Sequence, residues 1–147
     1  MFLKLTIGFL VFAIAAFQAN AESHTVTFTN NCGYGTPTLK SQTGETLSTG
    51  GAWTSSGSAL GGCGDNGEYC TLVEATLENG GSAADISLIP PHEFSVTSGF
   101  GYYDGCDGTG TDCTSSSCAM AYRSADDNFA IVGCGADNVN LAITFCD

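Results

Sequence analysis

The chain has 147 residues, with 15 acidic against 3 basic side chains, a formal net charge of -12, 20 glycines and 8 cysteines. A protein this acidic cannot gain affinity by displacing counterions from phosphate, which excludes nucleic acids and anionic membrane surfaces as expected partners. Because 12% of the residues are charged and 43% are hydrophobic, the composition also excludes a disordered acidic tail and suits one packed domain.

The first 21 residues have the pattern of a secretory signal peptide. Lys4 precedes an apolar run from Leu5 to Phe17, and Ala19 and Ala21 place small residues at the two positions that a signal peptidase recognises. The run is too short for a permanent anchor, which needs about 20 apolar residues. We therefore expect a cleaved signal peptide over 1–21 and a secreted, extracellular domain over 22–147 without stable membrane insertion.

Alternating side chains predict a strand at each end of this domain. In the segment 24–29, Val26 and Phe28 fall on one face, and in the segment 139–145 the large apolar residues alternate in the same way. The runs between the scattered glycines and serines follow this period of two rather than the helical period of 3.6. The pattern indicates an all-β domain.

The central segment 71–89 has the pattern of a β-hairpin. Asn79-Gly80 separates two alternating runs, and this dipeptide favours a type I′ turn in which both residues have positive φ. If these two residues form the tip, Val73 lies opposite Ile86 and the apolar residues of both strands share one face. We therefore predict a half-buried antiparallel pair of strands in this register.

The same register places Glu74 directly opposite Asp85 on the other face of the hairpin. Opposed like charges weaken a sheet by roughly 0.2–1 kcal/mol. Both side chains could simply be solvated and tolerated in a chain this acidic. Alternatively, paired carboxylates form a site that holds a cation, accepts hydrogen bonds from sugar hydroxyls, or divides into a proton donor and an ionised partner. The spacing does not choose among these uses.

All eight cysteines lie beyond the predicted signal peptide. An even number of cysteines in an exported chain predicts four structural disulfides, although the spacing does not fix the pairs. There is no C-x-x-C motif, and the two histidines, His24 and His92, have no partner at the spacing of a zinc finger. We expect no metal site and no cofactor.

Several segments, taken in chain order, resemble the thaumatin-like proteins and specifically the small forms of that family. No single match is specific, but the joint order covers nearly the whole domain. The matching segments are 26–32 (VTFTNNC), 71–74 (TLVE), 85–88 (DISL), 105–108 (GCDG), 118–122 (CAMAY) with the acidic pair 126–127 downstream, and 143–146 (ITFC).

The resemblance implies a fold and a disulfide scheme. The fold is a disulfide-stapled, two-sheet antiparallel β-sandwich of the thaumatin type. Larger members insert a second, disulfide-rich domain where this chain has only residues 114–117, so the binding groove should be shallower and more open here. The implied pairs are Cys32–Cys146, Cys63–Cys70, Cys106–Cys134 and Cys113–Cys118.

The resemblance also implies candidate site residues. Family function is associated with an acidic cleft built from one Arg, one Glu and three Asp. Glu74 matches the Glu, Asp85 matches the first Asp, and Asp126 or Asp127 matches the last. These four residues are the candidate carbohydrate-binding set, and Glu74 and Asp85 are the candidate catalytic pair.

Two members of the family's cleft have no clear counterpart in this chain. The middle Asp falls near residues 90–94, where Glu93 is a candidate replacement with an ambiguous alignment. The Arg falls between Trp53 and Cys63, where the sequence has no basic residue. These departures favour carbohydrate contact over hydrolysis.

The resemblance thus implies a secreted, monomeric protein that binds cell-wall polysaccharide of the β-1,3-glucan type through its acidic cleft. The same resemblance implies weak endo-β-1,3-glucanase or antifungal activity. The alternative is a non-catalytic secreted protein, acting in defence, as an inhibitor or as an effector on another protein. The sequence does not decide between the two.

Overall fold

The computed structural model describes residues 21–48, 54–55 and 63–147. The predicted signal peptide lies outside these ranges except for its last residue. The described residues form eleven β-strands and no α-helix, so this part of the chain has no helix with the length and hydrophobicity to cross a bilayer. The prediction of an all-β domain is confirmed.

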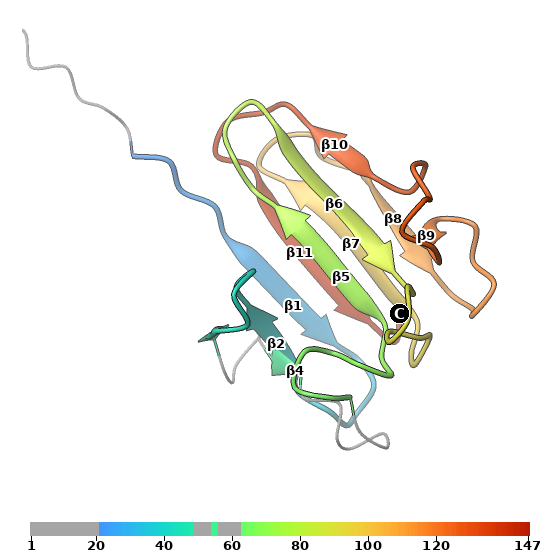
Figure 1. Ribbon diagram of the computed structural model, residues 1–147. Helices are drawn as coiled ribbons and strands as arrows, with labels where there is room; N and C mark the ends of the chain where they lie inside the picture. Colours follow the sequence, from blue (N-terminus) through green and yellow to red (C-terminus); the bar gives the residue numbers. More distant parts are fainter. Residues whose placement is uncertain (1–20, 49–53, 56–62) are drawn as a thin grey trace, which may run out of the picture.

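The first sheet brings the two ends of the domain together. Its strand order is β1 (Val26–Asn30), β11 (Asn140–Phe145), β7 (Ser98–Tyr103) and β8 (Gly110–Cys113). The predicted terminal strands are thus present, and Figure 1 shows β1 beside β11. These two strands run parallel, whereas β11, β7 and β8 pair antiparallel.

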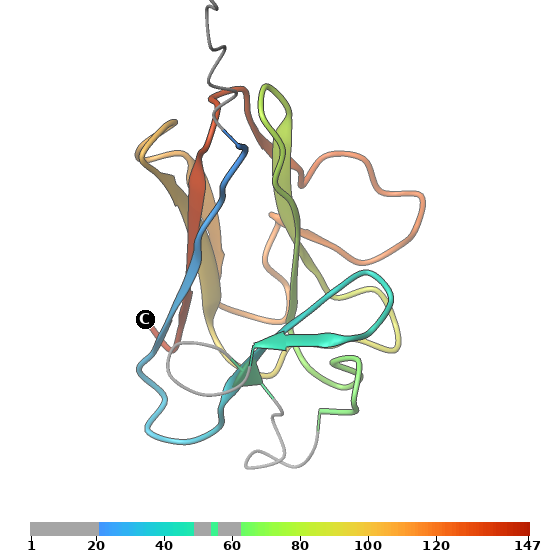
Figure 2. The same ribbon diagram turned by 90° about the vertical axis from the view of Figure 1, so that its left-hand side faces the viewer.

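The second sheet packs face to face on the first. It consists of β10 (Val132–Cys134), β6 (Ser82–Ser87) and β5 (Leu72–Thr76), with the short β9 (Ala121–Tyr122) parallel to the end of β6. Seen on edge in Figure 2, the two sheets stand as separate layers. The predicted sandwich is confirmed, with β1–β11 and β6–β9 as parallel exceptions to the antiparallel pattern.

A third, small sheet lies across one side of the sandwich. It contains β3 (Thr46–Ser48), β2 (Pro37–Lys40) and β4 (Thr54–Ser55), with β2 in the middle. In Figure 2 the β2–β3 hairpin (teal) crosses in front of the lower part of the second sheet and projects beyond it. This hairpin forms one wall of the groove described below.

The core lies between the two large sheets and follows the alternation of the strands. Ile86 on β6 and Leu141 on β11 are fully buried, together with Val139, and Phe100 contributes an aromatic ring from β7. The hydroxyl of Tyr102 donates a 2.9 Å hydrogen bond to the carbonyl of Val132 in the opposite sheet. Hydrophobic burial thus holds the two sheets together, and this hydrogen bond adds a polar contact between them.

Four disulfides join all eight cysteines, and the described residues contain no free thiol. They are the four pairs that the resemblance implies: Cys32–Cys146, Cys63–Cys70, Cys106–Cys134 and Cys113–Cys118. The first pair links the segment after β1 to the end of β11. The second and fourth close short local loops.

The β5–β6 hairpin has the predicted register but not the predicted turn. Strand partners include Val73 with Ile86, as expected. At the tip, Gly80 has a positive φ of 77° but Asn79 does not, and the Gly81 amide donates to the Glu78 carbonyl at 3.2 Å. A single positive φ at the third turn residue is the geometry of a type II turn, so the type I′ prediction is wrong.

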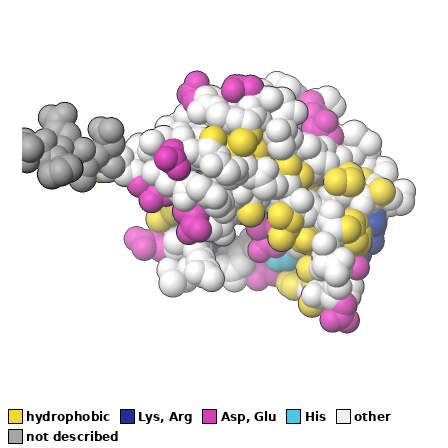
Figure 3. Space-filling model, turned by 90° about the horizontal axis from the view of Figure 1, so that it is seen from above, with side chains coloured by type: hydrophobic (Ala, Val, Ile, Leu, Met, Phe, Trp, Pro, Cys, Tyr) yellow, Lys and Arg dark blue, Asp and Glu magenta, His cyan; other side chains and the backbone are white. Residues whose placement is uncertain are grey.

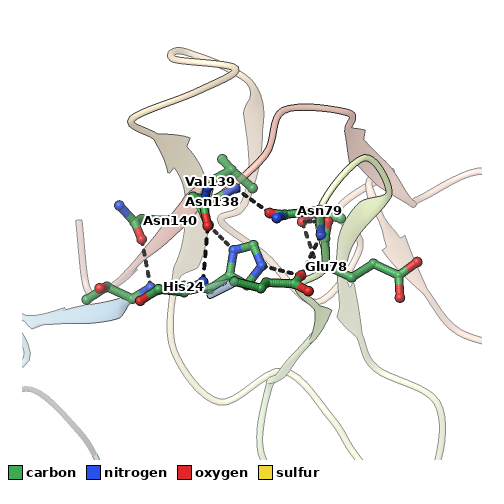
Figure 4. A network of polar contacts seen from close by, with 10 residues as sticks. His24, Glu78, Asn79, Asn138, Val139 and Asn140 are labelled. Carbon is green, nitrogen blue, oxygen red and sulfur yellow. Dashed lines mark hydrogen bonds and ion pairs between the residues drawn. The ribbon is translucent and has the colours of Figure 1, made fainter. Parts of the chain in front are cut away.

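A polar network ties the segment before β1 to the hairpin tip (Figure 4). The carboxylate of Glu22 contacts the imidazole of His24 at 2.9 Å and accepts a hydrogen bond from the Asn79 amide. The side chain of Asn79 accepts from the Asn138 amide at 2.6 Å, and the other ring nitrogen of His24 contacts the Val139 carbonyl. The contact with Glu22, and then that with Val139, raise the pKa of His24. Asn79 is therefore held from both its backbone and its side chain, which accounts for its departure from the expected turn.

Candidate functional site

Glu74 and Asp85 lie opposite each other on neighbouring strands, as predicted. Val73 and Ile86, the next residues along these strands, pack into the core. Because side chains alternate along a strand, both carboxylates are directed to the outer face of the second sheet. Glu74 is exposed, whereas Asp85 is half-buried.

The two carboxylates differ in their surroundings. Oδ2 of Asp85 is shielded from solvent and has no hydrogen-bond partner among the described residues. Burial, and then the negative charge of Glu74, raise the pKa of Asp85 from 3.8 to about 6. In mildly acidic solution Asp85 therefore holds a proton at a pH where an ordinary aspartate has lost it.

This shift predicts a pH-dependent effect of Asp85→Asn on stability. The folded protein holds the Asp85 proton more tightly than the unfolded chain, so the stabilising contribution is complete below pH 3.8 and is lost as the pH rises through about 6. The full shift corresponds to about 3 kcal/mol, which solvent screening of a half-exposed side chain reduces to about 1 kcal/mol. In urea unfolding, we expect the variant to gain that amount over the wild type between pH 4 and pH 7.

The matched control for this experiment is Asp107→Asn, which changes an exposed aspartate elsewhere on the surface. Its unfolding free energy relative to the wild type should not change between the two pH values. An Asp85→Asn variant that behaves like this control would contradict the assigned environment of Asp85.

A groove of about 1120 Å³ opens beside the pair. Glu74 and Asp85 line it together with Asp65 and with Lys40 at the end of β2. Figure 3 shows that acidic side chains are spread over the face seen from above, and that the surface is hollowed beside some of them. The groove is only partly enclosed, and residues of β1, β2, β5, β6 and β11 line it.

Sequence reasoning missed most residues of this groove, including one basic and one apolar side chain. Lys40 and Ile131 both line it, although β2 and the segment before β10 are far from the pair in sequence. Lys40 forms no ion pair with a carboxylate in the described part of the chain, and Ile131 is 59% exposed. The one available signal was that Lys40 and Arg123 are the only basic residues outside the predicted signal peptide. The segment where the family's Arg would fall lies almost entirely outside the described residues.

The other predicted acidic residues lie away from the groove lining. Oδ2 of Asp127 accepts hydrogen bonds from the backbone amides of Arg123 and Ser124, at 2.8 and 3.0 Å, and so caps the turn after β9. Asp126 is exposed beside it, and Glu93 does not line the groove either. The structure brings Glu74 and Asp85 together, and a role for Asp126 and Asp127 in the same site stays a prediction.

No group of three or more His, Cys, Asp or Glu side chains in the described ranges is arranged to hold a metal ion. Glu74 and Asp85 offer hydrogen-bond acceptors and, at Asp85, a proton.

No protein-family model matches the chain, and no curated protein matches it in sequence. Among solved structures, the chain is similar to the thaumatin-like xylanase inhibitor TLXI, with a TM-score of 0.52 and 19% sequence identity. The match covers 84% of this chain and 99% of the inhibitor. At this identity the similarity shows the fold alone, and the fold is thaumatin-like.

Proposed function

From this thaumatin-like fold we propose that the chain is a secreted member of the thaumatin-like family that binds cell-wall carbohydrate of the β-1,3-glucan type. The observation that carries the proposal is the cross-strand pair of Glu74 and Asp85 at the wall of an open groove. The family resemblance of the sequence assigns the same two residues to its acidic cleft.

The chemistry of the groove suits a polysaccharide. Carboxylate oxygens accept hydrogen bonds from sugar hydroxyls, and Glu74 exposes its carboxylate at the groove. Lys40 adds a hydrogen-bond donor, and the exposed side chain of Ile131 offers an apolar contact for the face of a pyranose ring. Ligand sites are usually lined by apolar side chains together with a few precisely placed polar groups.

The same pair could support slow hydrolysis. A glycosidase needs one protonated and one ionised carboxyl group flanking the scissile bond. Asp85, whose pKa is raised to about 6, is the candidate proton donor, and the exposed Glu74 is the candidate second carboxyl group. Weak endo-β-1,3-glucanase activity therefore belongs to the proposal, with its optimum below about pH 6.

A pull-down on insoluble β-1,3-glucan tests the binding proposal. We expect the double variant Glu74→Gln/Asp85→Asn to lose at least about 10-fold in retained protein, because two hydrogen-bond acceptors are weakened together. The charge-matched control, Glu78→Gln/Asp107→Asn, changes two exposed acidic residues outside the groove and should be retained like the wild type. Equal retention of all three proteins would refute the site.

A second candidate function is the inhibition of another protein. It is favoured by the similarity to a xylanase inhibitor and by exposed apolar side chains: Ile131, which lines the groove, is 59% exposed, and Phe129 is 53% exposed. Purified glycoside hydrolases, a xylanase among them, can be assayed with and without this protein. Inhibition that persists in the Glu74→Gln/Asp85→Asn variant, together with unchanged glucan retention, would select this function over the first.

A further inference from the structure

β5 is the outermost strand of the second sheet. It pairs with β6 on one side, and no described strand pairs with it on the other. In Figure 2, which looks onto this side of the sandwich, β5 and β1 form the two facing edges. An outermost strand presents a row of backbone donors and acceptors that can pair with another chain.

The hairpin geometry shows which backbone groups of β5 point outward. The Gly81 amide bonds to the Glu78 carbonyl, and hydrogen-bonded pairs then recur at every second position along an antiparallel ladder. Glu74 therefore bonds to Asp85 across the ladder. The residues between the bonded positions, Val73, Ala75 and Leu77, direct their N–H and C=O groups away from β6.

The groove runs along this outward edge. Every residue from Leu72 to Leu77 lines it, and so do Ile143 and Phe145 from the inner face of the first sheet. Val73 and Leu77 are only half-buried against the core, and Ala75 is exposed. The outward N–H and C=O groups of Val73, Ala75 and Leu77, which have no partner strand among the described residues, thus face a space with apolar walls on its inner side.

The outer side of the same space is acidic. Glu74 and Asp85 lie side by side on the outer face of β5 and β6, Asp65 lines the groove, and Lys40 is the one basic residue among the described lining residues. The whole chain carries a formal charge of -12. This charge disfavours a second copy of the protein as the occupant, because β5 pairing with itself would bring two such acidic edges together.

We propose that β5 accepts an added β-strand from a partner protein, namely an extended segment of about six residues in which apolar and basic side chains alternate. Backbone groups of the segment pair with Val73, Ala75 and Leu77. Side chains opposite these three residues enter the apolar part of the groove. Side chains opposite Glu74 lie on the outer face, where lysine or arginine meets the acidic pair.

This inference goes beyond carbohydrate binding and does not depend on it. The glucan proposal uses the carboxylates on the outer face, whereas strand addition also requires the free backbone edge. The two proposals share Glu74, but they differ in Ala75, whose amide has no part in the carbohydrate site.

A synthetic peptide of eight alternating lysine and valine residues, labelled with a fluorophore, is the probe for this edge. We expect it to bind the wild-type protein in fluorescence anisotropy at least about 10-fold more tightly than a peptide of the same composition in the order Lys-Lys-Val-Val. An alternating glutamate and valine peptide should not bind. Amide hydrogen exchange should slow at Val73, Ala75 and Leu77 on peptide addition.

The variant Ala75→Pro tests the backbone edge of β5 without changing the carboxylates of Glu74 and Asp85. Proline removes the outward N–H of residue 75 without removing a bond between β5 and β6, and outermost strands tolerate it at such a position. We expect peptide affinity to fall at least about 10-fold, while the circular dichroism spectrum stays that of the wild type and so reports that the variant is folded. Ala75→Val keeps the N–H and should bind the peptide as the wild type does.

If Ala75→Pro does not fold, N-methylated peptides give the same test on the wild-type protein. When the methyl group is moved along the peptide one amide at a time, binding should weaken at every second position. Only every second peptide amide faces β5. Equal binding of the alternating and reordered peptides, no change in exchange at the three outward amides, or no period of two would each overturn the proposal. Loss of glucan retention in Glu74→Gln/Asp85→Asn, with the peptide pattern absent, would leave the carbohydrate site standing alone.

Discussion

Replacing both Cys32 and Cys146 by alanine is expected to lower the free energy of unfolding by about 4.7 kcal/mol. The two cysteines are 114 residues apart in sequence, so their disulfide closes nearly the whole described domain into one loop. In the chain-entropy model, the stabilisation grows with the length of the closed loop because the cross-link restricts the unfolded chain more. Denaturant unfolding at equilibrium, with the other three disulfides intact, measures the loss.

The control for this prediction is the removal of Cys63–Cys70, which are seven residues apart. That variant should lose only about 2 kcal/mol, because the loop is short. If the two variants lose the same free energy, loop length does not determine the contribution, and the long-range disulfide acts through local packing instead.

Leu141→Ala should cost about 2–5 kcal/mol of unfolding free energy. Leu141 lies in β11, which has neighbours on both sides in the first sheet, and its side chain is fully buried between the sheets. Truncation removes buried apolar area and leaves a cavity that a ladder of paired strands cannot easily collapse. The change can be measured by thermal or urea unfolding.

The same substitution at an exposed leucine isolates the effect of burial. Leu47 lies in β3 and is 57% exposed, so Leu47→Ala should change the unfolding free energy by less than about 0.5 kcal/mol. Comparable losses at the two positions would mean that Leu141 does not lie at the centre of the core.

Local sequence patterns predicted the hairpin register correctly. Alternation on both sides of Asn79-Gly80 leaves one register that buries Val73 with Ile86, because a slip of one residue would turn every side chain to the opposite face. The opposition of Glu74 and Asp85 follows from that register without further information.

The turn type and the parallel pairings could not be predicted in the same way. The conformation of Asn79 depends on Glu22 and Asn138, which approach it only in the folded chain. The parallel pairing of β1 with β11 likewise joins segments that are distant in sequence. The alternation of side chains along one strand does not show which strand lies beside it.

The groove required the structure for a similar reason. Lys40 belongs to a small sheet that lies across the sandwich, and no local pattern places it beside Glu74. Charge could have suggested Lys40 as a partner, since basic residues are rare in this chain. Short sequence separation favoured Cys63–Cys70 and Cys113–Cys118 as local pairs, but the complete set of four disulfides came from the family resemblance.

The pairing of β1 with β11 has a consequence for the biosynthesis of the protein. Residues 26–30 leave the ribosome early, but the strand beside them is made of residues 140–145. The first sheet therefore cannot form completely until nearly the whole chain has been synthesised. Until then, β1 has no β11 to pair with. If the protein is secreted, as we propose, this order favours folding after translocation, in the compartment where Cys32 and Cys146 can form their disulfide.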